Sequence, residues 1–518
     1  MTQKKFKKIV QNRIKTIQKP ENRTLKNILF VVFLVFFFLA AFVYFKNSGL
    51  QKQIVLSAEE NQVLFDIFED ARNKNSKKNI EIFVKNFLKL KEEKCLKIEI
   101  QKDVFCDLKN ESAKECLLKT EILNFNPTCV LYKSFHLKKP QNIKAIYYSA
   151  YAAASAKKID YLIELAEKSD INAVVIDIKE ADGGLSVKIP TDGFEIKPKI
   201  LNIIKNPKAL IEKLHQKGIY VIARVVVFKD KNLVRQYPEF AVKRSDQKTI
   251  WKDHRHKTWL DANNPKVWDY IAEISKQVYL LGFDEVNLDY VRFPSDGPMR
   301  DIYYPYSNSE IVKSPRWGRA KVMDDFYFYY TQKLRKTFPE IQLSADVFGQ
   351  VALNWDDVSI GQILESAVLY FDGIYPMAYP SHYSWRFLPQ YTDGPDNHPY
   401  EVIEKTIKAS DKKIEDLNQK IAWSIENKKP LTIRPGVVSK IKPEDLKIIQ
   451  KNKVKFWLQA FYCSWCRNSK PYGLTEILLQ KKALEDSGHH NWLFWNASSR
   501  YKESHFVTQE NEWESMEG

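Results

Sequence analysis

The sequence predicts an α/β protein whose main body is a (β/α)₈ TIM barrel, preceded by an N-terminal transmembrane helix and a small helical, cysteine-containing segment. From residue 143 onward, short β-branched or aromatic runs alternate with helical patterns, as in the βα units of a parallel sheet. Eight such runs fit between residues 143 and 500, enough for one barrel with enlarged loops. An open doubly wound sheet is the alternative, but no glycine-rich phosphate loop follows the first run.

The predicted strands and helices alternate along this region. The strands are Lys144–Tyr151, Ala173–Ile178, Ile219–Val227, Glu285–Val291, Gln342–Val347, Gly373–Met377, Lys455–Phe461 and Trp492–Trp495. The helices include Pro207–Lys217, Pro265–Leu281, Trp317–Thr337, Ile360–Tyr370 and Tyr400–Ile414. The strand-like segment Leu431–Ser439 is not one of these eight strands, and we interpret it as an insertion before the seventh strand.

The N-terminus predicts a membrane anchor. Nine basic residues and one acidic residue precede Ile28–Phe45, which is eighteen apolar residues without a charge. Eighteen residues at helical rise just span a hydrocarbon core, and the basic flank predicts a cytoplasmic N-terminus with the remainder exported. A cleaved signal peptide is the alternative, although no clear small-x-small cleavage site follows. We therefore expect a basic cytoplasmic tail over 1–27, an anchor in the cell membrane over 28–45 and an extracytoplasmic barrel.

Composition excludes bulk disorder and argues against a nucleic-acid partner. Apolar residues make up 44% of the chain and charged residues 28%, which is ample material for a packed core. About half of the net charge of +17 lies in the short N-terminal tail, and elsewhere Lys often stands beside Glu or Asp. We expect a solvated surface and no nucleic-acid binding.

The six cysteines fit an exported protein. Four lie at Cys95, Cys106, Cys116 and Cys129, and two form Cys463-Ser-Trp-Cys466. An even count in an oxidising compartment predicts structural disulfides of undetermined pairing, with a metal site or a redox-active pair as alternatives. We interpret 46–140 as a helical stalk or accessory segment, 143–500 as the barrel domain and 501–518 as a polar C-terminal tail.

Polar residues gather where the predicted strands end. In a TIM barrel these ends converge on the active face, so position within each strand identifies candidates. Substrate contacts or charge partners are expected from Asp177, Lys179, Glu180, Arg224, Asn287, Arg292, Tyr379, His382, Gln459 and Trp495. Aromatic residues of the exit loops that could stack on sugar rings are Trp251, Trp259, Tyr303, Tyr304, Tyr306, Trp317, Tyr383 and Trp385.

Two further carboxylates are the candidate catalytic pair. Glycosidic cleavage needs two carboxyls across one bond, one ionised and one protonated. Asp289 and Asp346 on neighbouring strands supply such a pair, if an arginine keeps one ionised and apolar walls raise the pKa of the other. Either aspartate could instead be structural: Asp289 in an ion pair and Asp346 as a turn cap. We expect no cofactor and no obligatory metal.

Several sequence blocks together resemble a known family. VVIDIKEADGGL, GFDEVNLDYVRFPSDG, LSADVFG, DGIYPMAYPSHY and WLQAF occur in one order within residues 143–500. They resemble the glycoside-hydrolase-like family of bacterial TIM-barrel proteins of undefined substrate, related to the α-amylase-like barrels. The resemblance implies that Asp289 matches the strand-four carboxylate and that Asp346 is its candidate partner.

These observations predict a membrane-anchored glycoside hydrolase that cleaves a cell-envelope or environmental polysaccharide. Its expected partners are a polysaccharide or cell-wall glycan and, through Ile28–Phe45, the lipid bilayer. The alternative is a non-catalytic glycan-binding barrel tethered to the membrane.

Overall fold

The computed structural model describes residues 97–100, 104–107, 136–191, 193–466 and 469–506. The chain divides into two units, 1–131 and 132–518. In the first unit, β1 (Lys97–Ile100) and β2 (Val104–Asp107) form an antiparallel pair. The predicted anchor Ile28–Phe45 and the helical pattern of residues 46–90 lie outside the described residues. The pairing of the first four cysteines lies outside the described side chains. Within the described part of the chain, no helix is both long enough and apolar enough to cross a membrane.

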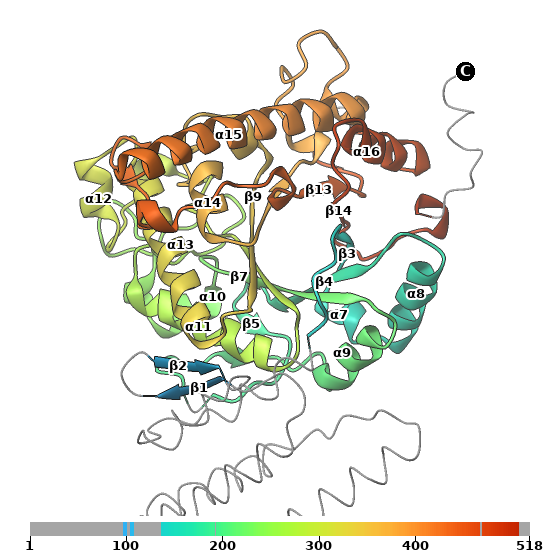
Figure 1. Ribbon diagram of the computed structural model, residues 1–518, viewed down its shortest axis with the longest axis horizontal. Coiled ribbons are helices and arrows are strands. Elements are labelled where there is room, and N and C mark those ends of the chain that lie inside the picture. The colour runs from blue at the N-terminus through green and yellow to red at the C-terminus, as the bar shows by residue number, and fades with distance from the viewer. Residues whose placement is uncertain (1–96, 101–103, 108–135, 192, 467–468, 507–518) are drawn as a thin grey trace, which may run out of the picture. The chain divides into compact units, whose positions relative to one another are not determined.

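The second unit is a closed barrel of eight parallel strands (Figure 1). They run in the order β3, β4, β7, β8, β9, β10, β13 and β14, and β14 pairs with β3 to close the ring. Their bounds are β3 Lys144–Tyr148, β4 Ala173–Lys179, β7 Tyr220–Val226, β8 Glu285–Asp289, β9 Gln342–Phe348, β10 Gly373–Met377, β13 Phe456–Gln459 and β14 Trp492–Trp495. Two short strands, β5 (Gly184–Leu185) and β6 (Lys199–Ile200), extend the sheet after β4.

The helices lie outside the ring of strands (Figure 1). They are α7 Ala150–Ala153, α8 Ala156–Glu167, α9 Pro207–His215, α10 Lys231–Gln236, α11 Pro265–Leu280, α12 Asn308–Lys313, α13 Gly318–Thr337, α14 Leu364–Tyr370, α15 Pro399–Asn427 and α16 Leu474–Asp486. The start of α11 shows how local sequence sets these bounds: the Asn264 side chain accepts from the N–H of Lys266, and Pro265 stands at the first turn.

Burial explains why the strands read as continuous apolar runs. Every residue of β4 and of β7 is buried, because one face of each strand meets the barrel interior and the other meets the helices. A charged residue in such a strand must therefore find a partner inside the protein. Asp177 in β4 and Arg224 in β7 are two of these residues.

The predicted barrel is confirmed: all eight predicted strands are found, with shifts at their ends, while β5 and β6 were not predicted and one predicted helix is longer than expected. The first strand ends at Tyr148 because Ser149 caps α7, its hydroxyl accepting from the N–H of Ala152. Helix α15 continues to Asn427, well beyond the predicted end at Ile414. Residues 431–439 hold an antiparallel hairpin, β11 (Thr432–Arg434) and β12 (Val437–Val438), that is separate from the barrel, as the insertion hypothesis expected.

The amino-terminal end of the barrel is closed by the segment before β3. The backbone N–H of Leu137 donates to Oδ1 of Asp284 at 2.6 Å. Lys139 Nζ lies 3.0 Å from Oε2 of Glu285, whose side chain is fully buried and also accepts from the hydroxyls of Tyr375 and Tyr220. This end is therefore a structural plug, and the carboxyl ends of the strands carry the candidate site.

Candidate active site

Four charged side chains of adjacent strands meet at the carboxyl end of the barrel. They come from β4 (Asp177), β7 (Arg224), β8 (Asp289) and β9 (Asp346). The register aligns Asp177 with Arg224 and places Asp289 beside Val226 at the end of β7. All four are buried. The sequence predicted each of them at its strand end, and the structure brings them together.

Arg224 links two of the carboxylates. Its Nη1 donates to Oδ1 of Asp177, while Nε, at 3.1 Å, and Nη2 both donate to Oδ2 of Asp289. Burial disfavours the charged guanidinium, but the two aspartates more than offset this effect and hold the pKa of Arg224 well above its ordinary value. Arg224 is therefore the cation that compensates the charge of two carboxylates buried in this apolar barrel.

Aromatic groups close the β3 and β14 side of this cluster. The hydroxyl of Tyr147 donates to Oδ2 of Asp177, and burial together with the charge of Asp177 raises the pKa of Tyr147 far above its ordinary value. The ring of Trp495 lies 3.8 Å, between centroids, from Tyr147, and the Arg224 guanidinium carbon lies 5.0 Å from the Trp495 centroid. Trp495 thus contacts the cluster through its ring, and its side chain is partly buried.

Asp346 has a different environment from Asp289. Its Oδ1 accepts from Nδ2 of Asn287 at 3.0 Å and from Nε1 of Trp457 at 2.8 Å. Burial and the charge of Asp289 raise the pKa of Asp346 well above its ordinary value, outweighing these hydrogen bonds and Arg224. One aspartate of the pair is thus paired with arginine, and the pKa of the other is raised by burial.

Glu180 is the half-buried carboxyl of the site. It follows β4, and burial, with a smaller contribution from the charge of Asp177, raises its pKa to about 7. The turn after it needs glycine at Gly183, where φ is +89° and a Cβ would overlap the side chain of Asp230. Glu180 is thus a protonatable group near neutral pH at the edge of the cluster.

Two other predicted residues have different partners. Lys179 Nζ lies 2.8 Å from Oδ2 of Asp230, whose other oxygen caps α10, and neither side chain is exposed to solvent. Arg292 forms no ion pair within 4.0 Å among the described residues; its guanidinium carbon lies 4.4 Å from the ring centroid of Phe348 and 4.9 Å from that of Trp259. Burial lowers the pKa of Arg292. Lys179 therefore fixes a loop, and Arg292 stacks beside the cluster.

Gln459 joins the exit loops of β10 and β13. Its Oε1 accepts from the backbone and hydroxyl of Ser381, at 3.0 and 2.8 Å, and its Nε2 donates to Oδ1 of Asp396 at 3.1 Å. The side chain is fully buried. These bonds make Gln459 a support for the rim residues.

Tyr379 and His382 follow β10. Burial and the charges of Asp346 and Asp289 raise the pKa of the buried Tyr379 well above its ordinary value. Its ring lies 5.3 Å from that of His382, which is exposed at the rim. Tyr379 thus faces the two catalytic candidates, and His382 is available to an incoming molecule.

Most of the proposed aromatic platforms are wrong. Five of the eight rings are buried and pack in the core: Trp251, Trp259, Tyr304, Trp317 and Tyr383. Exposed rings that follow barrel strands include Tyr151 after β3, Trp355 after β9, and Tyr462 and Trp465 after β13, with 72%, 54%, 53% and 66% exposure. The sequence feature that could have identified Tyr462 and Trp465 as exposed rings is their position beside and within the Cys463–Cys466 pair.

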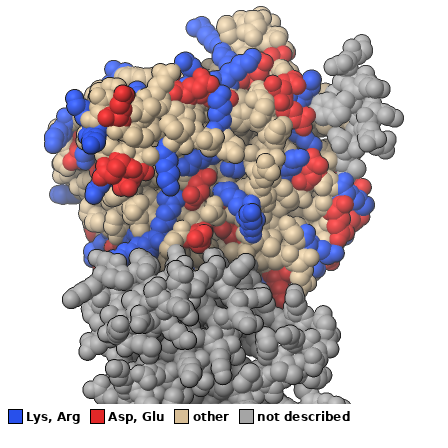
Figure 2. Space-filling view, viewed as in Figure 1, with Lys and Arg blue, Asp and Glu red and all other residues tan. Residues whose placement is uncertain are grey.

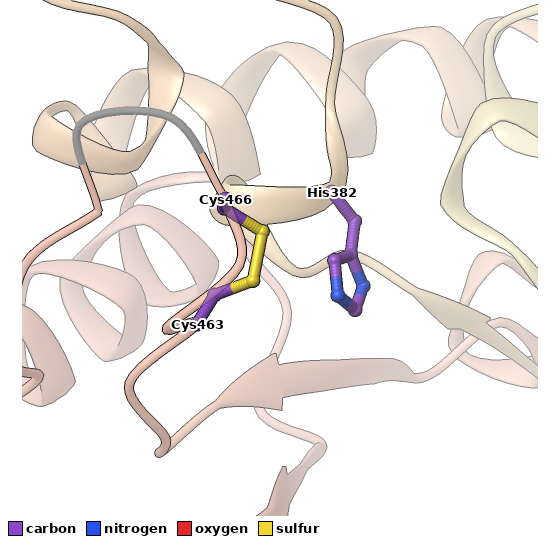
Figure 3. A group of neighbouring side chains, drawn as sticks. All are labelled: His382, Cys463 and Cys466. Carbon is purple, nitrogen blue, oxygen red and sulfur yellow. A yellow bond between two sulfur atoms is a disulfide. The ribbon is translucent and has the colours of Figure 1, made fainter.

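Cys463 and Cys466 form a disulfide, which confirms the expected cystine at this position (Figure 3). The ligand atoms of these two cysteines and His382 all lie within 4.8 Å of one another. Thiolate is the form of cysteine that binds metal, and the sulfur–sulfur bond consumes both thiols. The three side chains therefore form a cross-linked rim cluster.

A TIM barrel with a buried carboxylate cluster at its carboxyl end belongs to the class of folds that hold glycosidases. A family model described as "Putative glycosyl hydrolase domain" matches residues 145–425 and 423–501. The chain belongs to this glycosyl hydrolase family. The resemblance of the sequence blocks to a glycoside hydrolase family is thereby confirmed.

Solved structures with similarity to the chain include three of interest. A hypothetical protein from Ruminiclostridium thermocellum is 30% identical, with 39% of this chain and 97% of that chain covered and a TM-score of 0.33. The PgaB glycoside hydrolase domain from Bordetella bronchiseptica is 13% identical, with 70% and 95% covered and a TM-score of 0.47. An α-galactosidase from Thermus thermophilus is 12% identical, with 73% and 66% covered and a TM-score of 0.37. No curated protein matches the chain.

Proposed function

We propose that this chain is a membrane-anchored, extracytoplasmic hydrolase of a cell-envelope or environmental polysaccharide, with Asp289 and Asp346 as its catalytic pair. The observation that carries the proposal is the contrast between the two aspartates on neighbouring strands. Asp289 is bound by Arg224, and the pKa of Asp346 lies well above its ordinary value. One ionised and one protonated carboxyl are what glycosidic cleavage requires.

The two aspartates have distinct proposed roles. Asp289 acts as nucleophile or base, since its Oδ2 accepts two hydrogen bonds from the guanidinium of Arg224. Asp346 acts as general acid and protonates the leaving oxygen. Asp177, Arg224, Asn287, Arg292, Tyr379, His382 and Trp495 bind the sugar or tune these charges, and Lys179 and Gln459 position the loops that carry them.

A leaving-group experiment tests the role of Asp346. We expect Asp346→Asn to lose at least about a hundredfold in kcat on a polysaccharide, the size of a typical general-acid contribution. The same variant should keep most of its activity on aryl glycosides whose phenols leave without protonation. Glu180→Gln is the matched variant, because Glu180 is the other carboxyl of the site with a raised pKa. If Glu180→Gln alone shows this pattern, Glu180 and not Asp346 is the general acid.

The location is proposed from the N-terminal sequence. A basic run followed by Ile28–Phe45 fits a single-pass anchor with the barrel outside, and a Cys463–Cys466 disulfide suits an oxidising compartment. Protease added to intact cells should digest the barrel and leave the tail 1–27 protected. A barrel protected in intact cells and digested only after lysis would contradict this topology.

The tethered glycan-binding barrel is the second candidate function. The observation in its favour is that Arg224 bonds both Asp177 and Asp289, as in a structural ion-pair network. Asp346, however, has no arginine within ion-pair distance among the described residues, which favours the hydrolase. Glycan retention by both the parent and Asp289→Asn, without cleavage by the parent, would establish binding instead.

A further inference from the structure

Two loops from opposite sides of the barrel meet at its carboxyl end. The guanidinium carbon of Arg255 lies 5.5 Å from the ring centroid of Trp465. Arg255 lies between β7 and β8, and Trp465 lies between β13 and α16. In the ring of eight strands, β7 and β13 are fourth neighbours, so they stand opposite each other. The contact between these loops therefore crosses the opening.

Other contacts of the segment 252–257 agree with this position. The N–H of His254 donates at 3.2 Å to Oδ1 of Asp296, which follows β8. Nζ of Lys257 lies 3.2 Å from Oδ1 of Asp182, which follows β4. A segment that reaches the exit loops of β4, β8 and β13 lies over the opening that these strands surround.

The segment 252–257 is held in one shape by a buried carboxylate. Oδ1 of Asp253 accepts from the backbone N–H groups of Arg255 and Lys257, at 3.0 and 2.8 Å, and its Oδ2 accepts from Nε1 of Trp259 at 3.1 Å. His256 takes the left-handed conformation, with φ of 56°. The backbone position of Arg255 is thus set by the turn, and its exposed side chain reaches the ring of Trp465.

The opposite loop is fixed by its disulfide. Cys463 is fully buried, and its disulfide bond to Cys466 closes a short loop (Figure 3). In the sequence, Trp465 lies within this loop. Nearby, the ring of Phe461 lies 5.4 Å from Tyr379 and 5.7 Å from His382. Trp465 is 66% exposed, so packing in the core does not account for its place.

We propose that Arg255 and Trp465 form a bridge over the barrel mouth and that this bridge makes the enzyme act at glycan chain ends. The inference rests on the proposed hydrolase function and names its substrate class. A polymer cleaved in mid-chain must lie across an open mouth, and a bridge above the carboxylates interrupts that path. A chain end, in contrast, enters beneath the bridge.

The product profile tests the specificity. Chain-end cleavage releases reducing sugar with little loss of polymer viscosity, whereas mid-chain cleavage lowers viscosity at once. We expect the first behaviour from the full-length protein. With Trp465→Ala or Arg255→Ala, the viscosity of the polymer solution should fall several-fold faster per bond cleaved than with the parent. Lys252 is an exposed cation of the same segment, and Lys252→Ala should behave like the parent. An early fall in viscosity with the parent, or no change in the two bridge variants, would overturn the inference.

Hydrogen exchange tests the bridge without depending on activity. Both partners are exposed, so their substitution leaves the core intact. Trp465→Ala should raise amide exchange of residues 252–257 several-fold, and Lys252→Ala should not. Unchanged exchange in Trp465→Ala would show that the bridge is absent. If exchange responds but neither parent nor variants cleave any glycan, the proposed function fails while the bridge stands.

Discussion

Arg224 donates from Nε and from Nη2 to a single oxygen, Oδ2, of Asp289. Its remaining arm, Nη1, bonds Asp177 on the other side, so one cation serves two buried carboxylates. Within the site this arrangement leaves Asp346 without an arginine partner at ion-pair distance among the described residues. The asymmetry between the two candidate catalytic aspartates therefore follows from where β7 places one arginine.

Substituting Arg224 should be costly for stability. In Arg224→Gln two carboxylates lose their charge partner, and breaking a buried ion pair in this way costs roughly 3–5 kcal/mol. Denaturant unfolding at neutral pH measures the loss. Arg300→Gln, at an exposed position, is the control, and equal stability of the two variants would contradict the structural role.

Trp457 should tune the proton on Asp346. Its indole N–H donates to Oδ1 of Asp346 at 2.8 Å, and such a bond favours the ionised form and so lowers the pKa. Trp457→Phe removes the donor, so the pKa of Asp346 should rise further. The alkaline limb of the pH–rate profile should then move to higher pH. A shift to lower pH would contradict the assignment of Asp346 as the acid.

Glu180 should add a pH dependence to folding near neutrality. Burial raises its folded-state pKa to about 7, above the value in an unfolded chain, so the folded state binds this proton more tightly. Its contribution to stability is therefore fully present below the unfolded pKa and is lost as the pH rises towards 7. Glu180→Gln should flatten the dependence of unfolding free energy on pH between about 4.5 and 7. If the melting curves of Glu180→Gln across this pH range matched those of the parent, they would contradict the raised pKa of Glu180.

The plug at the amino-terminal end should contribute to stability without affecting catalysis. Lys139 lies 3.0 Å from Glu285, whose carboxylate is inaccessible to solvent. Lys139→Met leaves that charge less compensated and should cost about 3 kcal/mol, the lower end for a broken buried pair. Lys138→Met, at the exposed neighbouring position, should unfold like the parent. A fall in kcat without loss of stability in Lys139→Met would refute the division between a stabilising end and an active end.

The barrel could be predicted from the sequence because its strands are buried on both faces. Runs such as Ala173–Lys179 and Tyr220–Val226 contain almost only apolar residues, so the few charged residues within them are conspicuous. The same reasoning identified Asp177, Arg224 and Asp289. Strand ends were less certain, since the stop at Tyr148 depends on a cap that Ser149 provides.

Exposure of aromatic residues could not be predicted in the same way. Trp251 and Trp259 lie in an exit loop, yet both are buried: Trp259 pairs with Lys229 after β7, and Nε1 of Trp251 donates to the carbonyl of Pro298 after β8. The partners of Lys179 and the bridge between Arg255 and Trp465 depend on loops far apart in the sequence. Figure 2 shows basic and acidic side chains interspersed on the face that it draws, in keeping with the expected solvated surface.

Hydrolysis by the full-length protein and by Asp289→Asn, on a panel of wall and storage polysaccharides, tests the central claim most directly. The account predicts sugar release by the parent and a loss of at least about a hundredfold in the variant, given the usual size of acid–base contributions. Sugar release that is equal in parent and variant would contradict the assignment of Asp289. Release by neither would contradict the hydrolase itself.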